Sequence, residues 1–227
     1  YALTHRGNVL WQMGLDKEAR AALAQASSIA QRPNGSNKEL AAEIKMIKGR
    51  LELSLLHFRE SQDNSRQALN LAGTEYKDIA IQARSTLGLA LARSGELHAG
   101  SLLCEQAVDM AALTGDPQLL SGALLASAEA MLENGDPQRA LEIALQTQAS
   151  FARFGQQDSE WHAWLIAALA TERTGDATAR REYASQADIV LSNLTQKWGV
   201  ETYHSYLARL DVQRSRKQLG QVLKPQS

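Results

Sequence analysis

The chain has little of several residue types, and each shortage narrows what it can be. It has one cysteine, Cys104, in 227 residues, so no disulfide can form within the chain. That is typical of reducing compartments, and we expect a cytoplasmic location. Aromatic residues make up only 5% of the chain, and only four prolines occur. Because strands favour aromatic and β-branched residues, this composition indicates an all-α fold with a core of alanine and leucine.

An excess of charge of one sign is also missing. The 24 basic and 25 acidic residues give a formal net charge of −1. This balance provides no general attraction to nucleic acid or to an anionic membrane. No stretch approaches the roughly 18–20 apolar residues of a membrane span, and no signal-peptide pattern opens the chain. We therefore expect no membrane insertion, and no nucleic acid bound by this chain alone.

What the sequence does contain is a repeated segment. The stretch NGDPQRALEIALQT, which starts at residue 134, shares its skeleton with four others, among them SGELHAGSLLCEQA and TGDATARREYASQA. The five copies start at residues 13, 55, 94, 134 and 174, so their starts are 42, 39, 40 and 40 residues apart. The second copy, LLHFRESQDNSRQA, lacks the glycine. Self-similarity at a nearly fixed period is typical of a repeat architecture.

A second series of glycines lies between these copies, at Gly35, Gly73, Gly115, Gly155 and Gly199. Glycine is favoured just after a helix because it takes positive φ without a Cβ penalty, so each repeat is predicted to hold two helices. Asp16, Asp116, Asp136 and Asp176 are expected to cap helix starts, two of them before a proline. The expected helices are 1–13, 16–31, 37–55, 60–71, 76–93, 96–113, 117–133, 137–153, 157–173 and 177–196, then 200–209 and 212–221.

The residues resemble the tetratricopeptide (TPR) pattern W-x2-L-G-x2-Y followed by A-x3-F. The third repeat has Leu87-Gly88-x2-Leu91 and Gly100-x3-Cys104, and the fifth has Trp164 at the tryptophan position. The period of about 40, instead of 34, is similar to the longer TPR-like repeats of bacterial regulators. The resemblance implies an all-α, right-handed α-solenoid of five TPR-like helical hairpins plus C-terminal capping helices. The implied repeats are 1–34, 35–75, 76–115, 116–155 and 156–197, with the cap and a basic tail in 198–227.

No arrangement of residues indicates catalysis. The five histidines are not at metal-ligand spacing with one another, and no HExxH, CxxC, P-loop or nucleophile-elbow motif occurs. Cys104 falls on a core position of the repeat, so we interpret it as a buried structural thiol. We therefore expect a protein that is not an enzyme and has no metal and no cofactor.

The TPR resemblance also implies a binding surface, because the first helix of each repeat lines the concave face in that family. One subset of the family, the carboxylate-clamp TPR domains, binds the C-terminal tails of chaperones and requires Lys and Asn at set groove positions. Here only Asn8 matches, and Thr4 stands where the Lys is required. We therefore do not expect this chain to bind chaperone tails. The implied groove has basic groups early and acidic groups late, which suits a ligand of mixed charge. Its candidate residues are Thr4, Asn8, Trp11, Gln12, Arg50, Gln82, Ser85, Arg93, Glu129, Glu133, Glu172 and Arg173.

Two regions leave alternatives open. Trp161 is either a core residue or a partner-facing anchor. Beyond the repeats, Trp198, Tyr203 and Tyr206 are spaced to cover the exposed last repeat. Residues 209–227 then carry five basic side chains and one acidic one, which predicts a solvated or self-docking tail, with a nucleic-acid arm as the alternative.

We predict a non-catalytic module that binds a protein or peptide, as the sensing or docking part of a larger bacterial regulator. One alternative is a structural array that self-associates, for example as a homodimer. Another is a region of a multidomain protein kinase or transcriptional regulator whose catalytic or DNA-binding domain lies elsewhere. The chain starts at Tyr1, inside what reads as the first helix of a repeat, so we expect it to be the C-terminal part of a longer protein.

Overall fold

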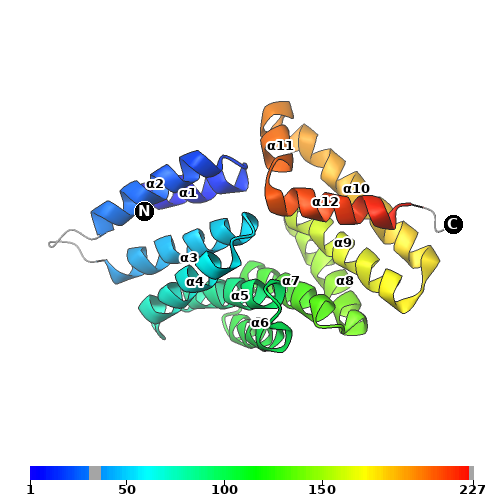
Figure 1. Cartoon of the computed structure of the whole chain (residues 1–227), viewed down its shortest axis with the longest axis horizontal. Helices are drawn as coiled ribbons and strands as arrows, with labels where there is room; N and C mark the ends of the chain where they lie inside the picture. The colour runs from blue at the N-terminus through cyan, green and yellow to red at the C-terminus, as the bar shows by residue number, and fades with distance from the viewer. Residues whose placement is uncertain (31–36, 225–227) are drawn as a thin grey trace.

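A computed structural model describes residues 1–30 and 37–224, and these contain twelve α-helices (Figure 1). Each helix expected from the sequence is present, with ends within two residues of those expected wherever the ends are described. The expected turn at Gly35 lies outside the described residues. The helices are α1 (Ala2–Gln12), α2 (Asp16–Ala30), α3 (Lys38–Ser54), α4 (Phe58–Ala72), α5 (Lys77–Arg93), α6 (Leu97–Ala112), α7 (Pro117–Glu133), α8 (Pro137–Phe154), α9 (Gln157–Thr174), α10 (Ala177–Trp198), α11 (Val200–Leu207) and α12 (Leu210–Val222).

The helices pack in the order of the chain, as in a TPR-like solenoid. Each helix contacts the next, and the odd-numbered helices α1 to α9 also contact one another in series. The odd-numbered helices therefore form one continuous layer. Figure 1 shows the array bending into an arc, which brings α1 and α2 round toward α11 and α12. None of the described helices is long and apolar enough to cross a membrane.

Left-handed residues separate the paired helices. Gly95, Gly135 and Gly175 have φ of 102°, 84° and 88° at the turns that follow α5, α7 and α9. In the second copy, where the sequence has no glycine, Leu56 takes this place with φ 61°. A side chain in the left-handed region costs roughly 1–2 kcal/mol. The second repeat therefore has the same turn conformation as the others although it has no glycine at this position.

Three of the four expected helix caps are present. Asp116 accepts hydrogen bonds from the backbone N–H groups of Gln118 and Leu119, at 2.8 and 3.2 Å. Asp136 and Asp176 cap α8 and α10 in the same way. The expectation for Asp16 is wrong, because α2 begins at Asp16 itself and its buried Oδ1 has no hydrogen-bond partner. The side chain therefore does not bind the free N–H groups that a cap would satisfy.

Small residues allow the paired helices to cross closely. A Cβ added to Gly88 would lie 2.5 Å from Cys104 Sγ and 2.8 Å from the carbonyl oxygen of Gly100. Cys104 is fully buried at this crossing, as expected for a core position. Trp161 is also fully buried, and its Nε1 donates a hydrogen bond to Tyr206 Oη at 2.8 Å. Trp161 is therefore a core residue and not an exposed anchor.

The C-terminal helices cover the last pair and then reach the first. Trp198 packs edge-on against Tyr206, with ring centroids 5.1 Å apart. After α11, helix α12 turns back along α9 and α10 and also contacts α3. At the α1–α2 turn, a Cβ on Gly14 would lie only 2.1 Å from the carbonyl oxygen of Ser205. The two ends of the described array are therefore in direct contact.

Candidate functional site

The arc encloses a cavity of about 970 Å³. Its walls come from the odd-numbered helices α1 to α9, from the end of α8 and the α8–α9 turn, from the end of α10, and from α12 with the residue that precedes it. The odd-numbered helices are those that the sequence predicts to line the concave face. Nine residues named from the sequence line the cavity: Trp11, Gln12, Arg50, Gln82, Ser85, Arg93, Glu129, Glu133 and Arg173. Their role in binding stays a prediction.

Three residues named from the sequence do not line the cavity. Thr4 is fully buried in α1, two helical turns before the end of the helix that reaches the cavity. Asn8 lies one turn before Gln12 on the same face, and its Oδ1 is buried without a partner. Glu172 is exposed and forms an ion pair with Arg180 of α10 at 3.6 Å, because it lies about 100° around α9 from Arg173.

One end of the cavity is built around Trp11. Its indole Nε1 donates a hydrogen bond to Ser54 Oγ at 2.9 Å, which fixes the ring against α3. The guanidinium of Arg50 lies 4.6 Å from the ring centroid and that of Arg209 lies 4.9 Å from it. Such stacking is attractive because the face of the ring is electron-rich. Burial, and then the nearby charge of Arg209, lower the pKa of Arg50 to about 10.

The cavity wall also holds a partly buried ion pair between α5 and α7. Arg93 Nε donates to Glu129 Oε1 at 2.8 Å, and the two side chains are 13% and 25% exposed. Burial by itself lowers the pKa of Arg93, but the ion pair with Glu129 offsets this and raises the pKa above its ordinary value. The sequence predicts basic groups in the early repeats of the groove and acidic groups in the late ones. In the structure, the basic Arg93 of α5 and the acidic Glu129 of α7 form an ion pair with each other.

The C-terminal segment supplies cavity residues that the repeat register cannot predict. Arg209 binds Asp211 at 2.6 Å, and Arg214 of α12 binds Glu133 of α7 at 3.2 Å. The sequence predicts either a solvated or a self-docking tail. These contacts are those of a self-docking tail. The only sequence signal for them was the excess of basic residues after position 208, because α12 is not part of the repeat.

Helix α9 also lines the cavity with groups that the sequence did not single out. His162 Nδ1 donates to the backbone oxygen of Asp158 at 2.7 Å, since a carbonyl oxygen can only accept. Burial lowers the pKa of His162, although that hydrogen bond opposes the shift. The imidazole is therefore neutral near pH 7 and its Nε2 can accept a hydrogen bond. In residues 1–30 and 37–224, no group of three or more His, Cys, Asp and Glu is placed to hold a metal ion.

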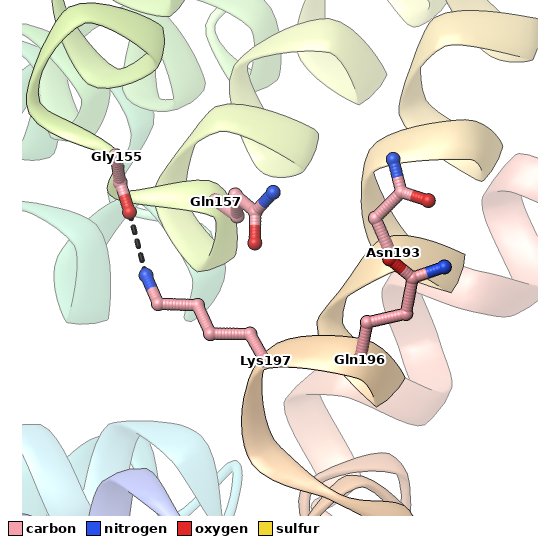
Figure 2. A pocket seen from close by; sticks show the side chains of 5 residues that line it. All are labelled: Gly155, Gln157, Asn193, Gln196 and Lys197. Carbon is pink, nitrogen blue, oxygen red and sulfur yellow. Dashed lines mark hydrogen bonds between the residues drawn. The ribbon is translucent and has the colours of Figure 1, made fainter.

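A smaller hollow of about 480 Å³ lies at one edge of the cavity (Figure 2). Lys197, at the end of α10, donates a hydrogen bond to the carbonyl oxygen of Gly155 at 2.7 Å. Gln157, Asn193 and Gln196 complete its wall, and Gly155 and Lys197 line both spaces. The hollow thus carries amide groups and one cation that is already bound to the backbone.

These features define a TPR-like helical solenoid whose inner face surrounds a cavity with both polar and apolar walls. No family model and no curated protein matches the sequence. Among solved structures, the chain is similar to a Rap protein complexed with Competence and Sporulation Factor, with a TM-score of 0.76 and 13% identity over 97% of this chain and 65% of that one. It is also similar to apo RapI, with a TM-score of 0.66 and 10% identity over 98% of this chain and 82% of that one.

A third similar structure is a putative kinesin light chain of Podospora anserina with TPR-like repeats. Its TM-score is 0.59 at 19% identity, over 86% of this chain and 95% of that one. At such low identities the comparisons show that the fold is TPR-like. The chain spans about two thirds (65%) of the length of the first Rap protein.

Proposed function

We propose that the chain is a non-catalytic module that binds a short peptide in the cavity, as the docking part of a larger cytoplasmic regulator. The observation that carries the proposal is the cavity itself, which lies on the inner face of the array and measures about 970 Å³. That volume is within the ~300–1,000 Å³ of ordinary ligand sites. The Rap protein of similar fold was solved with a bound factor.

The composition of the cavity wall also suits a peptide. Leu53, Leu89 and Leu125 supply apolar surface, while Gln82 and Gln118 supply amides that can pair with a peptide backbone. Six of the twelve Asp, Glu, Lys and Arg side chains in the wall are paired with each other, and the other six are three acidic and three basic groups, so the cavity does not require a highly charged ligand. A mixture of apolar and amide groups is what extended peptides need for affinity and register.

Gly122 offers a direct test because it lines the cavity and an added Cβ would meet nothing within 4 Å. Gly122→Trp should place an indole ring in the cavity, where it obstructs a peptide, without disturbing the helices. We expect the wild-type protein to retain members of a mixture of random hexapeptides on size-exclusion chromatography, read by mass spectrometry. Gly122→Trp should abolish retention.

The matched control is Gly220→Trp. Gly220 also lies within a helix, with open space around an added Cβ, but it does not line the cavity. It should retain the same peptides as the wild type. Equal retention by both variants would place peptide binding outside the cavity, and no retention by the wild type would contradict the proposed function as a whole.

A further inference from the structure

The cationic side chains that line the cavity differ in what they bind. Within the described residues, three arginines form ion pairs with carboxylates, and one arginine and one lysine donate to backbone carbonyl oxygens. These five are Arg93, Arg209, Arg214, Arg173 and Lys197. The sixth cation, Arg50, contacts only one neutral acceptor, the amide oxygen of Gln82, at 3.3 Å. Arg50 thus lacks a carboxylate partner, as Arg173 and Lys197 do, but those two residues are exposed to solvent whereas Arg50 is partly buried.

The position of Arg50 is fixed although its charge is not balanced. Its guanidinium stacks on the ring of Trp11, which is 7% exposed and held by Ser54. Stacking uses the flat face of the guanidinium and leaves N–H groups at its edge free to donate. Since Arg50 lines the cavity, a ligand inside the cavity can reach that edge.

The surroundings of Arg50 disfavour an isolated positive charge. Burial and the neighbouring Arg209 together lower the pKa of Arg50 to about 10, and only Asp158 opposes them. Asp158 belongs to α9, and in the described residues it forms no ion pair with Arg50 within 4.0 Å. An anion bound between the walls would relieve this cost, because opposite charges nearby favour the charged form of a group.

We propose that the Arg50 end of the cavity is an anion subsite that binds a carboxylate of the peptide. The two N–H groups at the edge of the guanidinium match the two oxygens of a carboxylate. Gln12 and Gln82 lie at the same end, and the amide nitrogen of Gln82 can donate because its oxygen accepts from Arg50. The carboxylate is either the peptide's C-terminus or an Asp or Glu side chain. This subsite rests on the proposed function and adds the chemistry of its ligand.

The test uses three hexapeptide mixtures with the intact protein. The first is N-acetylated and C-terminally amidated and contains no Asp or Glu, so it has no carboxylate. The second has the same residues and a free C-terminal carboxylate, and the third is amidated but contains Asp and Glu. We expect the wild-type protein to retain the second mixture, the third or both at least about tenfold better than the first. The mixture that gains identifies the source of the carboxylate.

Arg50→Gln should remove this preference and leave retention of the carboxylate-free mixture unchanged. Arg50→Lys keeps the charge without the planar edge, so it should show a reduced preference, and it carries the test if Arg50→Gln does not fold. The matched control is Arg66→Gln, because the Arg66 side chain is 50% exposed on α4 and does not line the cavity. It should behave as the wild type.

Equal retention of the three mixtures by the wild-type protein would overturn the subsite while leaving peptide binding intact. A preference for carboxylates that persists in Arg50→Gln would also overturn it, because the anion would then be bound elsewhere. Retention of no mixture by the wild-type protein would overturn the subsite together with the proposed function.

Discussion

The guanidinium of Arg209 lies 4.9 Å from the ring centroid of Trp11, so the residue before the last helix packs on the first helix. Arg209 also donates to the backbone oxygen of Gln12 at 3.4 Å, and Asp211 balances its charge. Trp11 and Tyr206 belong to separate apolar clusters. The two ends of the array therefore meet through a polar contact and close the cavity without sharing a core.

Removing this contact should loosen the closed array. We expect Arg209→Ala to lower the free energy of unfolding by about 1–3 kcal/mol, because it removes the stacking on Trp11 and leaves Asp211 without its partner. The radius of gyration measured by small-angle X-ray scattering should increase. The control is Arg216→Ala, an exposed residue of α12 that does not line the cavity. An unchanged radius in both variants would mean that Arg209 does not hold the ends together.

Gly14 tests the same closure from the other end. Gly14→Ala introduces a Cβ at φ 79° that would lie 2.1 Å from the carbonyl oxygen of Ser205. Gly95→Ala faces the same kind of backbone strain at φ 102°, but its Cβ meets nothing within 4 Å. Both should lose roughly 1–2 kcal/mol of stability from strain, and Gly14→Ala should lose more in urea unfolding. Equal losses would show that α11 does not pack tightly on the α1–α2 turn.

The close crossing of paired helices predicts that alanine substitution changes stability in opposite directions at Gly88 and Gly122. Gly88→Ala should destabilise the protein by about 1–3 kcal/mol, because the new Cβ would overlap Cys104 Sγ and the backbone of Gly100. Gly122→Ala should stabilise it by roughly 0.5–1 kcal/mol, since alanine is the better helix former and the site is open. Thermal and urea unfolding would measure both. A stabilising Gly88→Ala would contradict the crossing.

The arrangement of the helices was predictable because its signals repeat. Glycine turns and aspartate caps recur about every 40 residues, and each marks a local backbone requirement that does not depend on distant contacts. Leu56 shows the limit of this reasoning, because it adopts the turn conformation without the residue that would predict it. The same register placed nine of the twelve residues named from the sequence in the cavity wall, since helical periodicity fixes which side chains share a face.

The closure of the array could not be predicted in the same way. The contacts of Arg209 with Trp11 and of Arg214 with Glu133 join segments that no repeat relates. Their formation depends on the summed curvature of the whole solenoid, and a single stretch of sequence does not encode that sum. The repeat register alone assigns Asn8 to the groove, but Asn8 lies on α1 one turn before Gln12 and so stops short of the cavity. The register predicts which face of a helix points inward, but which turn of that helix reaches the cavity also depends on the curvature of the array.

Asp16 should make stability depend on pH in one direction. Burial raises the pKa of its carboxyl above 3.8, although Arg209 opposes the shift. The folded state therefore holds this proton more tightly than the unfolded state, so its stabilising effect is present below the unfolded pKa and is lost as pH rises through the folded pKa. Asp16→Asn should match the wild type in urea at about pH 3 and exceed it at pH 7.

The gain at pH 7 should be no more than about 1 kcal/mol, because the carboxyl is partly exposed and solvent screens it. Glu18→Gln is the control for removing an acidic charge from the first turn of α2. A variant that is less stable than the wild type at pH 7 would show that the attraction between Asp16 and Arg209 outweighs the burial.

Cys104 should be inert in the folded protein. It is fully buried, and burial raises the pKa of its thiol from 9.0 to about 12, so almost no reactive thiolate is present at pH 8. We expect a thiol reagent such as iodoacetamide to label it only as fast as the protein opens, and at the rate of a free thiol in concentrated urea. Gly88→Ala pushes on Cys104 Sγ and should speed labelling of the folded state, whereas Gly122→Ala should not. Rapid labelling of the wild-type protein, followed by mass spectrometry at pH 8, would contradict a structural role for this thiol, because a packed core site excludes the reagent as well as water.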